Sequence, residues 1–386
     1  MTIMLDLNES EETTALREAV RSFALAELAP QVDEYDRSDR FHEYLWPKLG
    51  EMGFMGVMVP EADGGLGLGY GAHTVILEEM ARISAAAAMS YGVHSSLVMD
   101  QLRKNGTDDQ RRRYYPKLLS GESIASIAMT EADAGSDLVG MRTTATKKGD
   151  RWVLNGSKLW ITNSANANFV MVYAKTDPSA GKRGITAFLV EKSFGGMRVG
   201  RKLDLFGMRA SGSAELVFEN CEVPEENVIG EVNGGVSVLM GGLDYERVIA
   251  GAQCVGIMQA AMDLVLPYVR ERKQFGQPIG EFQLMQGKMA DIYTPLNAGR
   301  AYVQAAASAA DRGRLTRKDA ASVFLFVAEN ATQVALQAMQ ALGANGYSNE
   351  YSAQRLVRDA KLFEIGGGTA EVRRMLIGRE LYREFG

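Results

Sequence analysis

The sequence predicts a multidomain α+β protein, in which an N-terminal α-helical domain and a C-terminal four-helix bundle flank a middle antiparallel β-barrel or sandwich. Hydrophobic residues recur with the helical period of about 3.6 in the first and last thirds of the chain, and with the strand period of about two between them. In addition, 386 residues are too many for one hydrophobic core. We therefore expect domains over residues 1–121, 122–232 and 233–386.

The first domain begins with an amphipathic helix. Leu16, Val20, Ala24 and Leu28 recur every fourth residue, and Pro30 follows as a stop signal. These repeating apolar positions are expected to place one face of the helix against a core.

Three further signals organise the rest of this domain. The alanine-rich run 73–99 indicates one or two helices, and Thr107 with Gln110 forms a capping box that starts another. Pro116 is expected to break that last helix. The glycine-rich run 64–72 contains G-x-G-x-x-A but lacks the strand and acidic residue of a dinucleotide fingerprint, so we interpret it as a flexible loop before a helix.

The middle domain begins near Gly121, where the hydrophobic period changes to two. Its clearest hairpin signal is Asn155-Gly156 between two apolar runs, because Asn-Gly supplies the positive φ angles of a type I′ turn. Further short strands are predicted over 169–175, 184–191, 197–203 and 214–219. Strands in this spacing, without helices between them, indicate an antiparallel barrel or sandwich.

The helical period returns after residue 235 and continues to the C-terminus. Helices are predicted over 236–273, 282–313, 317–343 and 353–383, the last broken near Gly366. Thr316 with Asp319 marks the start of the third. The first carries an apolar stripe of Val248, Val255, Met258, Met262 and Val265. Four long helices with short links predict an up-down bundle.

The composition argues against several classes of protein. A net charge of −6 and a pI near 5.4 argue against a nucleic-acid-binding surface, which needs a basic face. The basic clusters at 111–113, 270–273 and 373–374 lie on helical runs, and we interpret them as solvated faces. No window of about 18 apolar residues is free of charges and amides, so we expect no membrane span.

The cysteines and the N-terminal segment bear on location. Cys221 and Cys254 lie in different segments, which predicts a reducing compartment rather than a disulfide framework. Residues 1–12 are acidic and have neither the apolar core of a secretory signal nor the arginines of a transit peptide. We therefore expect a cytoplasmic protein.

Most common catalytic motifs are absent from the sequence. His42, His73 and His94 lie in unrelated helical contexts without HExxH or CxxC, so no metal site is expected. Neither G-x-S-x-G nor the P-loop motif occurs. What remains are glycine and small polar residues clustered at 130–137 and 366–371. The second cluster can start a helix whose N–H groups hold a phosphate or carbonyl oxygen.

Four motifs, taken together, resemble those of a known family. They are Thr130-Glu131-x-x-Ala134-Gly135-Ser136-Asp137, Lys158-x-Trp160-Ile161-Thr162-Asn163, Arg272-x-x-Phe275-Gly276 with Gln283, and Gly368-Thr369-x-Glu371-Val372-Arg373-Arg374. In this order and spacing they resemble the successive signatures of the acyl-CoA dehydrogenase family, over essentially the whole chain. The resemblance implies the same helix–sheet–helix plan and an FAD cofactor between the barrel and the bundle.

The resemblance also implies which residues bind FAD. The flavin ring is expected to contact Ile127, Met129, Thr130, Gly135, Ser136, Trp160, Ile161 and Thr162, with Thr130 and Thr162 nearest its polar edge. The adenine and phosphate half of a neighbouring subunit's FAD is expected to contact Arg272, Phe275, Gln283, Gln340 and Gly343. Thr369 and Glu371 are expected to contact FAD as well. Contacts that cross between subunits imply a homotetramer.

The catalytic base departs from the pattern of most members. They carry a glutamate two residues before the threonine of the last motif, and here that position is Gly367. Leu243-Asp244-Tyr245-Glu246-Arg247 instead resembles the branch that oxidises isovaleryl-CoA, where the base lies on the first bundle helix. Glu246 is therefore the expected base. The alternative is that this acid, near the start of a helix, only interacts favourably with the positive end of the helix dipole. Gly367 can still offer its backbone N–H to the thioester oxygen.

The substrate arm and the electron acceptor follow from the same resemblance. The residues expected to contact the acyl-CoA are Ser136, Ser237, Asp244, Arg247, Gly367 and Gly368. The electron acceptor is expected to be an electron-transfer flavoprotein. A short branched substrate, isovaleryl-CoA as in leucine catabolism, is the first expectation.

Several departures from this branch leave alternatives open. Ser237 replaces an aromatic residue, and 252–254, Ala132 and Ala344 also differ from the usual pattern. They are explained either by neutral drift or by a roomier pocket for a longer branched chain such as citronellyl-CoA, and medium- or long-chain substrates remain open too. Because Gly367 replaces the usual acid, a non-catalytic flavin- or acyl-CoA-binding protein is an alternative, and so is an oxidase.

Overall fold

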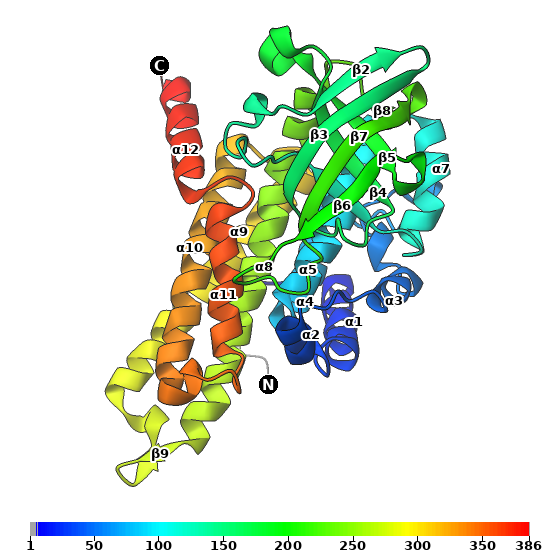
Figure 1. The fold of residues 1–386 in the computed structure, drawn as a ribbon. Coiled ribbons are helices and arrows are strands. Elements are labelled where there is room, and N and C mark those ends of the chain that lie inside the picture. Colours follow the sequence, from blue (N-terminus) through cyan, green and yellow to red (C-terminus); the bar gives the residue numbers. More distant parts are fainter. Residues whose placement is uncertain (1–4, 6, 386) are drawn as a thin grey trace.

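Helical parts lie before and after a middle sheet in this chain, as the sequence predicts. The computed structural model describes residues 5 and 7–385, and the bundle runs along one side of the sheet and the N-terminal helices (Figure 1). The multidomain α+β class and the order of its three parts are therefore confirmed. The expected boundaries at 121/122 and 232/233 fall in connections between elements and stay a prediction.

The N-terminal part is helical throughout. Its elements are α1 (Glu11–Glu27), α2 (Val32–Ser38), α3 (Leu45–Glu51), α4 (Gly69–Ile83), α5 (Ala85–Gly92), a π-helix (Val93–Asp100), α6 (Gln101–Asn105) and α7 (Asp108–Leu119). Val20, Ala24 and Leu28 are fully buried, as the apolar stripe predicts. The Thr107–Gln110 capping box begins α7, but the predicted break at Pro116 is wrong because α7 continues through this proline to Leu119.

The middle part is an eight-stranded sheet. Its strands are β1 (Ala125–Ala128), β2 (Thr144–Lys148), β3 (Arg151–Ile161), β4 (Phe169–Lys175), β5 (Ile185–Glu191), β6 (Met197–Lys202), β7 (Ala214–Pro224) and β8 (Val228–Ile229). They lie in the order β6-β7-β3-β2-β4-β5-β8, with β1 beside β4. Most pairs are antiparallel, as predicted, but β4 pairs in parallel with both β1 and β2, so the sheet is mixed.

Side chains from two halves of the sheet meet in one core. Trp152 of β3 packs edge-on against Phe188 of β5, with ring centroids 5.8 Å apart. The opposite face of β4 and β5 buries Met171 and Leu189 against the N-terminal helices. Strands β4 and β5 are thus buried on both faces, one against other strands of the same sheet and the other against helices.

The hairpin predicted at Asn155-Gly156 is wrong, because both residues lie inside β3. The β2–β3 turn instead lies between Lys148 and Arg151, which pair across the two strands. Gly156 marks a register shift against β7, and a Cβ there would lie 2.6 Å from Oγ1 of Thr143. A glycine is needed here because Thr143 approaches the backbone closely. Asn-Gly is therefore compatible with an irregular position inside a strand as well as with a hairpin turn.

The C-terminal part forms the predicted bundle. Its helices are α8 (Gly235–Glu271), α9 (Gln283–Asp311), α10 (Arg317–Leu342), α11 (Ala353–Ile365) and α12 (Ala370–Phe385), with a small β9–β10 hairpin (Lys273–Gln274 and Gln277–Pro278) after α8. The apolar stripe of α8 is buried throughout. Thr316 caps α10 by accepting a hydrogen bond from the N–H of Asp319, as predicted.

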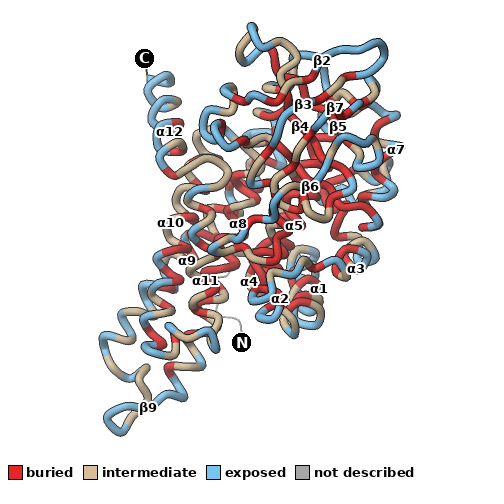
Figure 2. The backbone as a smooth tube through the Cα atoms, viewed as in Figure 1, coloured by how far each residue is buried: buried red, intermediate tan, exposed pale blue. Residues whose placement is uncertain are grey.

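Helix α8 is the apolar centre of the bundle. It is long enough and apolar enough to cross a membrane, with a mean hydropathy of 1.5 over its best window. However, 83% of that window is buried within this protein, and Figure 2 shows the helix enclosed by its neighbours. Such burial is typical of the central helix of a folded bundle.

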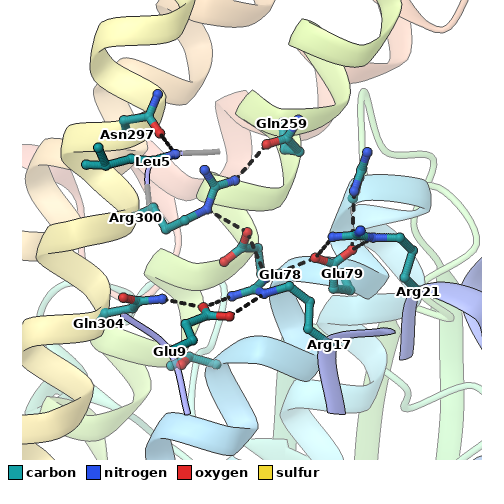
Figure 3. A network of polar contacts seen from close by, with 12 residues as sticks. Leu5, Glu9, Arg17, Arg21, Glu78, Glu79, Gln259, Asn297, Arg300 and Gln304 are labelled. Atoms are coloured by element: carbon teal, nitrogen blue, oxygen red, sulfur yellow. Dashed lines mark hydrogen bonds and ion pairs between the residues drawn. The ribbon is translucent and has the colours of Figure 1, made fainter. Parts of the chain in front are cut away.

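A network of charged and amide side chains joins the first helix to the bundle (Figure 3). Arg17 of α1 donates to Glu79 of α4 at 2.9 Å, and Arg300 of α9 donates to Glu78 at 2.9 Å. Gln259 of α8 accepts from Arg300 at 2.7 Å. These interactions tie α1, α4, α8 and α9 together.

Candidate active site

Glu246 and Gly367 meet where α8 passes the connection between α11 and α12. A Cβ built on Gly367 would lie 3.8 Å from Oε1 of Glu246 and 3.0 Å from Cε1 of Phe324 on α10. Two positions that are 121 residues apart in the sequence therefore face the same point in space. The Glu246 carboxylate therefore lies next to the position that the first side-chain atom of residue 367 would occupy.

The Glu246 carboxylate is buried and unpaired. Its Oε2 is inaccessible and has no hydrogen-bond partner among the described residues. Burial raises the pKa of this carboxyl to about 7, and the charges of Arg247 and Arg373 only partly oppose the rise. A carboxyl group held in this state near neutral pH is suited to accept a proton rather than to stabilise the fold.

The connection at 366–368 is a glycine turn that exposes backbone donors. Gly367 and Gly368 have φ values of +64° and +85°, which favour glycine. Within the described part of the chain, the N–H of Gly367 donates no hydrogen bond. Thr369 then caps α12, accepting from the N–H of Val372 at 3.3 Å. The turn can therefore offer an N–H to an oxygen beside Glu246.

The segments predicted to hold the flavin ring lie together at the end of β1 and β3. The carbonyl of Thr130 accepts a hydrogen bond from the N–H of Leu159 at 2.9 Å. Trp160 has a φ of +65° and is 58% exposed, which is unusual for a large aromatic residue. The side-chain hydroxyls of Thr130 and Thr162 make no hydrogen bond with other described residues. Strain and free polar groups of this kind are typical of a ligand site.

Tyr173 connects this sheet edge to Glu246. It follows β4 residue Val172, which pairs with Ala128 of β1, so Tyr173 lies beside the chain as it leaves β1. Burial, and to a lesser extent the negative charge of Glu246, raise the pKa of the Tyr173 hydroxyl. The base candidate and the flavin segments therefore share one region between the sheet and the bundle.

A buried ion pair supports the flavin segments from behind. The ammonium of Lys158, fully buried, donates to the carboxylate of Glu131 at 2.9 Å and to the carbonyl of Met129 at 3.0 Å. Glu131 also accepts from the N–H groups of Arg142 and Thr143. Burial lowers the pKa of Lys158 to about 8, although Glu131 opposes that shift. The sequence motifs contained both residues, but their contact was not predicted.

A groove opens at the start of α8. Its volume is about 560 Å³, and its lining includes Lys182, Arg183, Ser237, Met240 and Arg317. Ser237 was predicted to contact substrate and lies in this groove. The groove gathers three positive side chains beside an apolar methionine, which suits an amphipathic ligand with phosphate groups.

Asp244 links the groove to the base. It accepts from Arg247 at 2.6 Å and lies 3.8 Å from Arg317, a groove residue. Arg247 is 9% exposed and its Nε has no partner among the described residues. Both predicted substrate residues on this turn of α8 therefore lie between the groove and Glu246. Ser136, the remaining one, is exposed beside the flavin segments.

The residues predicted for the adenine half of FAD do not lie near this site. All five are exposed at the far end of α8 and α10: Arg272, Phe275 and Gln283 flank the β9–β10 hairpin, and Gln340 and Gly343 end α10, where Tyr268 of α8 donates to the carbonyl of Leu342. Along α8, Arg272 is roughly 40 Å from Glu246, at about 1.5 Å of rise per residue. One chain therefore does not bring the two predicted parts of the FAD site together.

From the sequence, Arg373 was misinterpreted and its ring partner, Phe324, was not identified. Arg373 was interpreted as part of a solvated basic face, and this is wrong because its side chain is fully buried. Its guanidinium lies 3.5 Å from the centre of the Phe324 ring. Neighbouring Arg374 is exposed and pairs with Glu329 at 2.6 Å, as expected. The break near Gly366 and a helix start at 366–371 were predicted, but the helical phase that turns Arg373 inward and Arg374 outward in α12 was not.

Three family models match the chain in order. They describe the N-terminal domain of acyl-CoA dehydrogenase over residues 10–122, the middle domain over 126–221 and the C-terminal domain over 233–382. Together they cover most of the sequence and match its helical, sheet and bundle parts.

Individual proteins are similar over nearly the full length. The chain is 52% identical to the mitochondrial isovaleryl-CoA dehydrogenase of Solanum tuberosum and 53% identical to the mitochondrial 2-methylacyl-CoA dehydrogenase of the same organism. Each comparison covers 95% of this chain and 90% of the relative. The solved structure of PigA with FAD and proline has a TM-score of 0.93 at 28% identity, covering 98% of this chain and 99% of that one. The chain therefore belongs to the acyl-CoA dehydrogenase family.

Proposed function

We propose that this chain oxidises a short branched acyl-CoA thioester to its α,β-unsaturated product, with Glu246 as the catalytic base and FAD as the cofactor. The observation that carries the proposal is the unpaired Glu246 carboxylate beside the free N–H of Gly367. A base and an oxygen-binding donor that face one point are what removal of a proton next to a carbonyl requires.

The chain's own groups account for the proton transfer. The proton on the α-carbon of a thioester is a weak acid, so the carboxylate must lie close to it. The thioester oxygen, on which negative charge develops, accepts a hydrogen bond from Gly367. Burial makes Glu246 a stronger base than an exposed glutamate, because it raises the pKa of the carboxyl to about 7. Bound FAD supplies the redox chemistry by accepting the β-hydrogen as hydride.

The residues present fit a flavin ring at the sheet edge. Exposed Trp160 and the free hydroxyls of Thr130 and Thr162 offer a stacking surface and hydrogen-bond partners. The ion pair of Lys158 with Glu131 fixes these segments before the cofactor binds. A solved relative, PigA, binds FAD. Residues 127–136 and 160–162 would hold the ring, with Thr369 and Glu371 near it.

The distance between the two halves of the predicted FAD site supports an oligomer. Arg272 lies roughly 40 Å along α8 from Glu246, at about 1.5 Å of rise per residue, which is too far for one chain to supply both halves of a single site. We therefore place the residues predicted for the adenine half against FAD of another subunit, in a homotetramer. Phe275 is 94% exposed in the single chain, which is consistent with an aromatic side chain that a second subunit covers.

The groove at the start of α8 would hold the CoA arm. Lys182, Arg183 and Arg317 can neutralise phosphates at its mouth, and Asp244 and Arg247 then lead inward to the base. Electrons would leave through an electron-transfer flavoprotein. A cytoplasmic location stays a prediction.

The acyl group is proposed to be isovaleryl, giving 3-methylcrotonyl-CoA as in leucine catabolism. A second candidate is a 2-methylacyl group, because a relative named for that substrate is as similar to this chain as the isovaleryl-CoA dehydrogenase is. A longer branched chain such as citronellyl would need more room at the end of the pocket.

Anaerobic mixing of the flavin-loaded protein with acyl-CoA tests the proposal. Isovaleryl-CoA is expected to bleach the flavin faster than 2-methylbutyryl-, hexanoyl- or citronellyl-CoA. Glu246→Gln should slow bleaching by roughly 10²–10⁴-fold, the usual contribution of a general base, while its flavin spectrum stays unchanged. Near-normal bleaching in this variant would show that another group takes the proton.

The same samples separate the rival functions. No bleaching by any acyl-CoA would identify a flavin-binding protein without this activity. Rapid reoxidation by air would identify an oxidase, whereas slow reoxidation by air and fast reoxidation by an electron-transfer flavoprotein would identify a dehydrogenase.

A further inference from the structure

Arg373 is a buried cation that lacks a direct carboxylate partner. Its Nη2 donates to the carbonyl of Phe363, in the last turn of α11, at 2.7 Å and to that of Gly366, the first residue of the glycine turn, at 2.6 Å. Its Nε and Nη1 have no partner among the described residues. A buried guanidinium usually pairs with a carboxylate, so this arrangement calls for an explanation other than stability.

The guanidinium, an aromatic ring and the glycine turn form one stack. Arg373 lies 3.5 Å from the centre of the Phe324 ring, and a Cβ at Gly367 would lie 3.0 Å from Cε1 of the same ring. The ring is 1% exposed and belongs to α10, in the middle of the bundle. Arg373 therefore fixes the turn twice, through the carbonyl of Gly366 and through the ring beneath Gly367.

The same cation also acts on Glu246 without forming an ion pair. No ion pair joins Glu246 to any residue that the structure describes. The groups that face this carboxyl are Arg247 on its own helix, Arg373 on α12 and Tyr173 on β4. Burial lowers the pKa of Arg373 to about 10, while nearby Cys254 and Glu246 oppose that shift. At this pKa the guanidinium is charged throughout the range in which Glu246 titrates.

A direct ion pair would make Glu246 a weaker base. A cation within about 4–6 Å lowers a carboxyl pKa by about 1–3 units and occupies its lone pairs. A cation one layer away assists ionisation of the carboxylate less strongly and leaves both oxygens free to accept a proton.

From this geometry we propose that Arg373 is a positioning residue of the proposed dehydrogenation: it locks the Gly366–Gly368 turn against Phe324 and supplies a remote positive charge to Glu246. The proposal rests on the proposed function and assigns to Arg373 two separable effects. One is mechanical, through two carbonyls and a ring, and the other is electrostatic.

Two substitutions separate the effects. Arg373→Met removes the charge and the donors, so the midpoint of the acid limb of kcat/KM should rise by about 0.5–1 pH unit as Glu246 becomes harder to ionise. Arg373→Lys keeps the charge but cannot donate to both carbonyls while lying flat on the ring. Its midpoint should stay within about 0.3 unit of the original while its plateau rate falls about 10–100-fold, since the turn loses its alignment.

Arg374→Met is the matched control. It removes an arginine from the same helix, but one that is exposed and paired with Glu329, so neither midpoint nor plateau should change. Equal shifts in the Arg373 and Arg374 variants would overturn the electrostatic part, because any surface charge would then suffice. An unchanged plateau in Arg373→Lys would overturn the mechanical part.

Infrared titration of the holoprotein reads Glu246 without turnover. The band of the protonated carboxyl that Glu246→Gln abolishes is followed against pH in the original protein, Arg373→Lys and Arg374→Met. Its midpoint should be the same in all three and higher in Arg373→Met. If Arg373→Met does not fold, Arg373→Lys alone tests the proposal: a midpoint of its carboxyl band shifted by about 0.5 pH unit or more from that of the original protein would contradict it. If the protein oxidises no acyl-CoA, the proposed function fails, but this titration still shows whether Arg373 changes the pKa of Glu246. The two failures can therefore be told apart.

Discussion

Two regions of this protein bury glutamates in opposite ways. In the network between α1 and the bundle, the side chain of Glu79 is 1% exposed and accepts from Arg17 and Arg21 at 2.9 Å (Figure 3). These arginines lower its pKa even though burial alone would raise it. Glu246 is buried beside two arginines as well, yet it bonds to neither, and its pKa rises to about 7.

The comparison shows that pairing, and not burial, decides the direction in which the pKa of a buried glutamate shifts. Glu79 has its lone pairs occupied and its charge neutralised, so it contributes to holding helices together. Glu246 has the desolvation cost without the compensating hydrogen bonds, so its ionised form is high in free energy and accepts a proton readily.

The largest expected difference between the two regions is in stability. Glu79→Gln should lower the free energy of unfolding by about 3–5 kcal/mol, because Arg17 and Arg21 would lose a buried partner. Glu246→Gln should not lower it, since no bond is lost. Urea unfolding of both flavin-loaded variants measures the contrast. A similar loss in both variants would show that Glu246 has a structural partner.

The next expected effect concerns the turn that faces Glu246. Gly367→Ala forces an L-residue to φ +64° and places a methyl group 3.0 Å from Phe324, at a cost of about 1–3 kcal/mol in local strain. We expect a lower rate of flavin bleaching with FAD still bound. Gly378→Ala is the control, because its Cβ meets nothing within 4 Å on α12. It should leave the rate unchanged.

A smaller effect is expected from pH on the reaction. Glu246, the proposed base, must be ionised to accept a proton, and burial raises its pKa to about 7. The value of kcat/KM should therefore fall about tenfold per pH unit below 7 and level off above it. A pH–rate profile with isovaleryl-CoA measures this limb, and Glu79→Gln should leave its midpoint in place. A midpoint near 4.5, the ordinary value for glutamate, would mean that Glu246 is solvated.

The smallest expected effect is the pH dependence of stability that Glu246 adds. Its pKa is higher in the folded than in the unfolded protein, so the unfolded state releases the proton first as pH rises from about 4.5 to 7. Folding thus becomes less favourable across this window. Glu246→Gln should stabilise the protein at pH 8 relative to the original and be neutral at pH 4.5, as seen in melting temperatures. Glu79→Gln should show no such gain at pH 8.

Local signals in the sequence were sufficient for much of the fold. The helix start at Thr107 depends on two side chains three residues apart, and the α8 stripe depends on helical period alone. Asn155-Gly156 was misread because the same dipeptide fits a bulge. The glycine lies within β3 because this strand pairs with β2 at Asn155 and with β7 on both sides of Gly156, and such long-range pairing is not visible in the dipeptide.

The site was predictable in its motifs and not in its contacts. Glu246 and Gly367 were both named from the sequence, but their apposition arises from the packing of α8 against the α11–α12 connection. The burial of Arg373 and its contact with Phe324 depend on the phase of α12 and on α10. No period in the sequence indicates such long-range relations.

The apolar character of α8 has a consequence for how the protein is made. Residues 235–271 leave the ribosome before α9 to α12, which later cover them, have been synthesised. Until then a segment with the length and hydropathy of a membrane anchor is bare on several sides, a state prone to aggregation. Helix α4, which is synthesised earlier and packs against α8, can cover part of this surface at that stage, and we expect expression yield to be sensitive to substitutions that delay folding of the later helices.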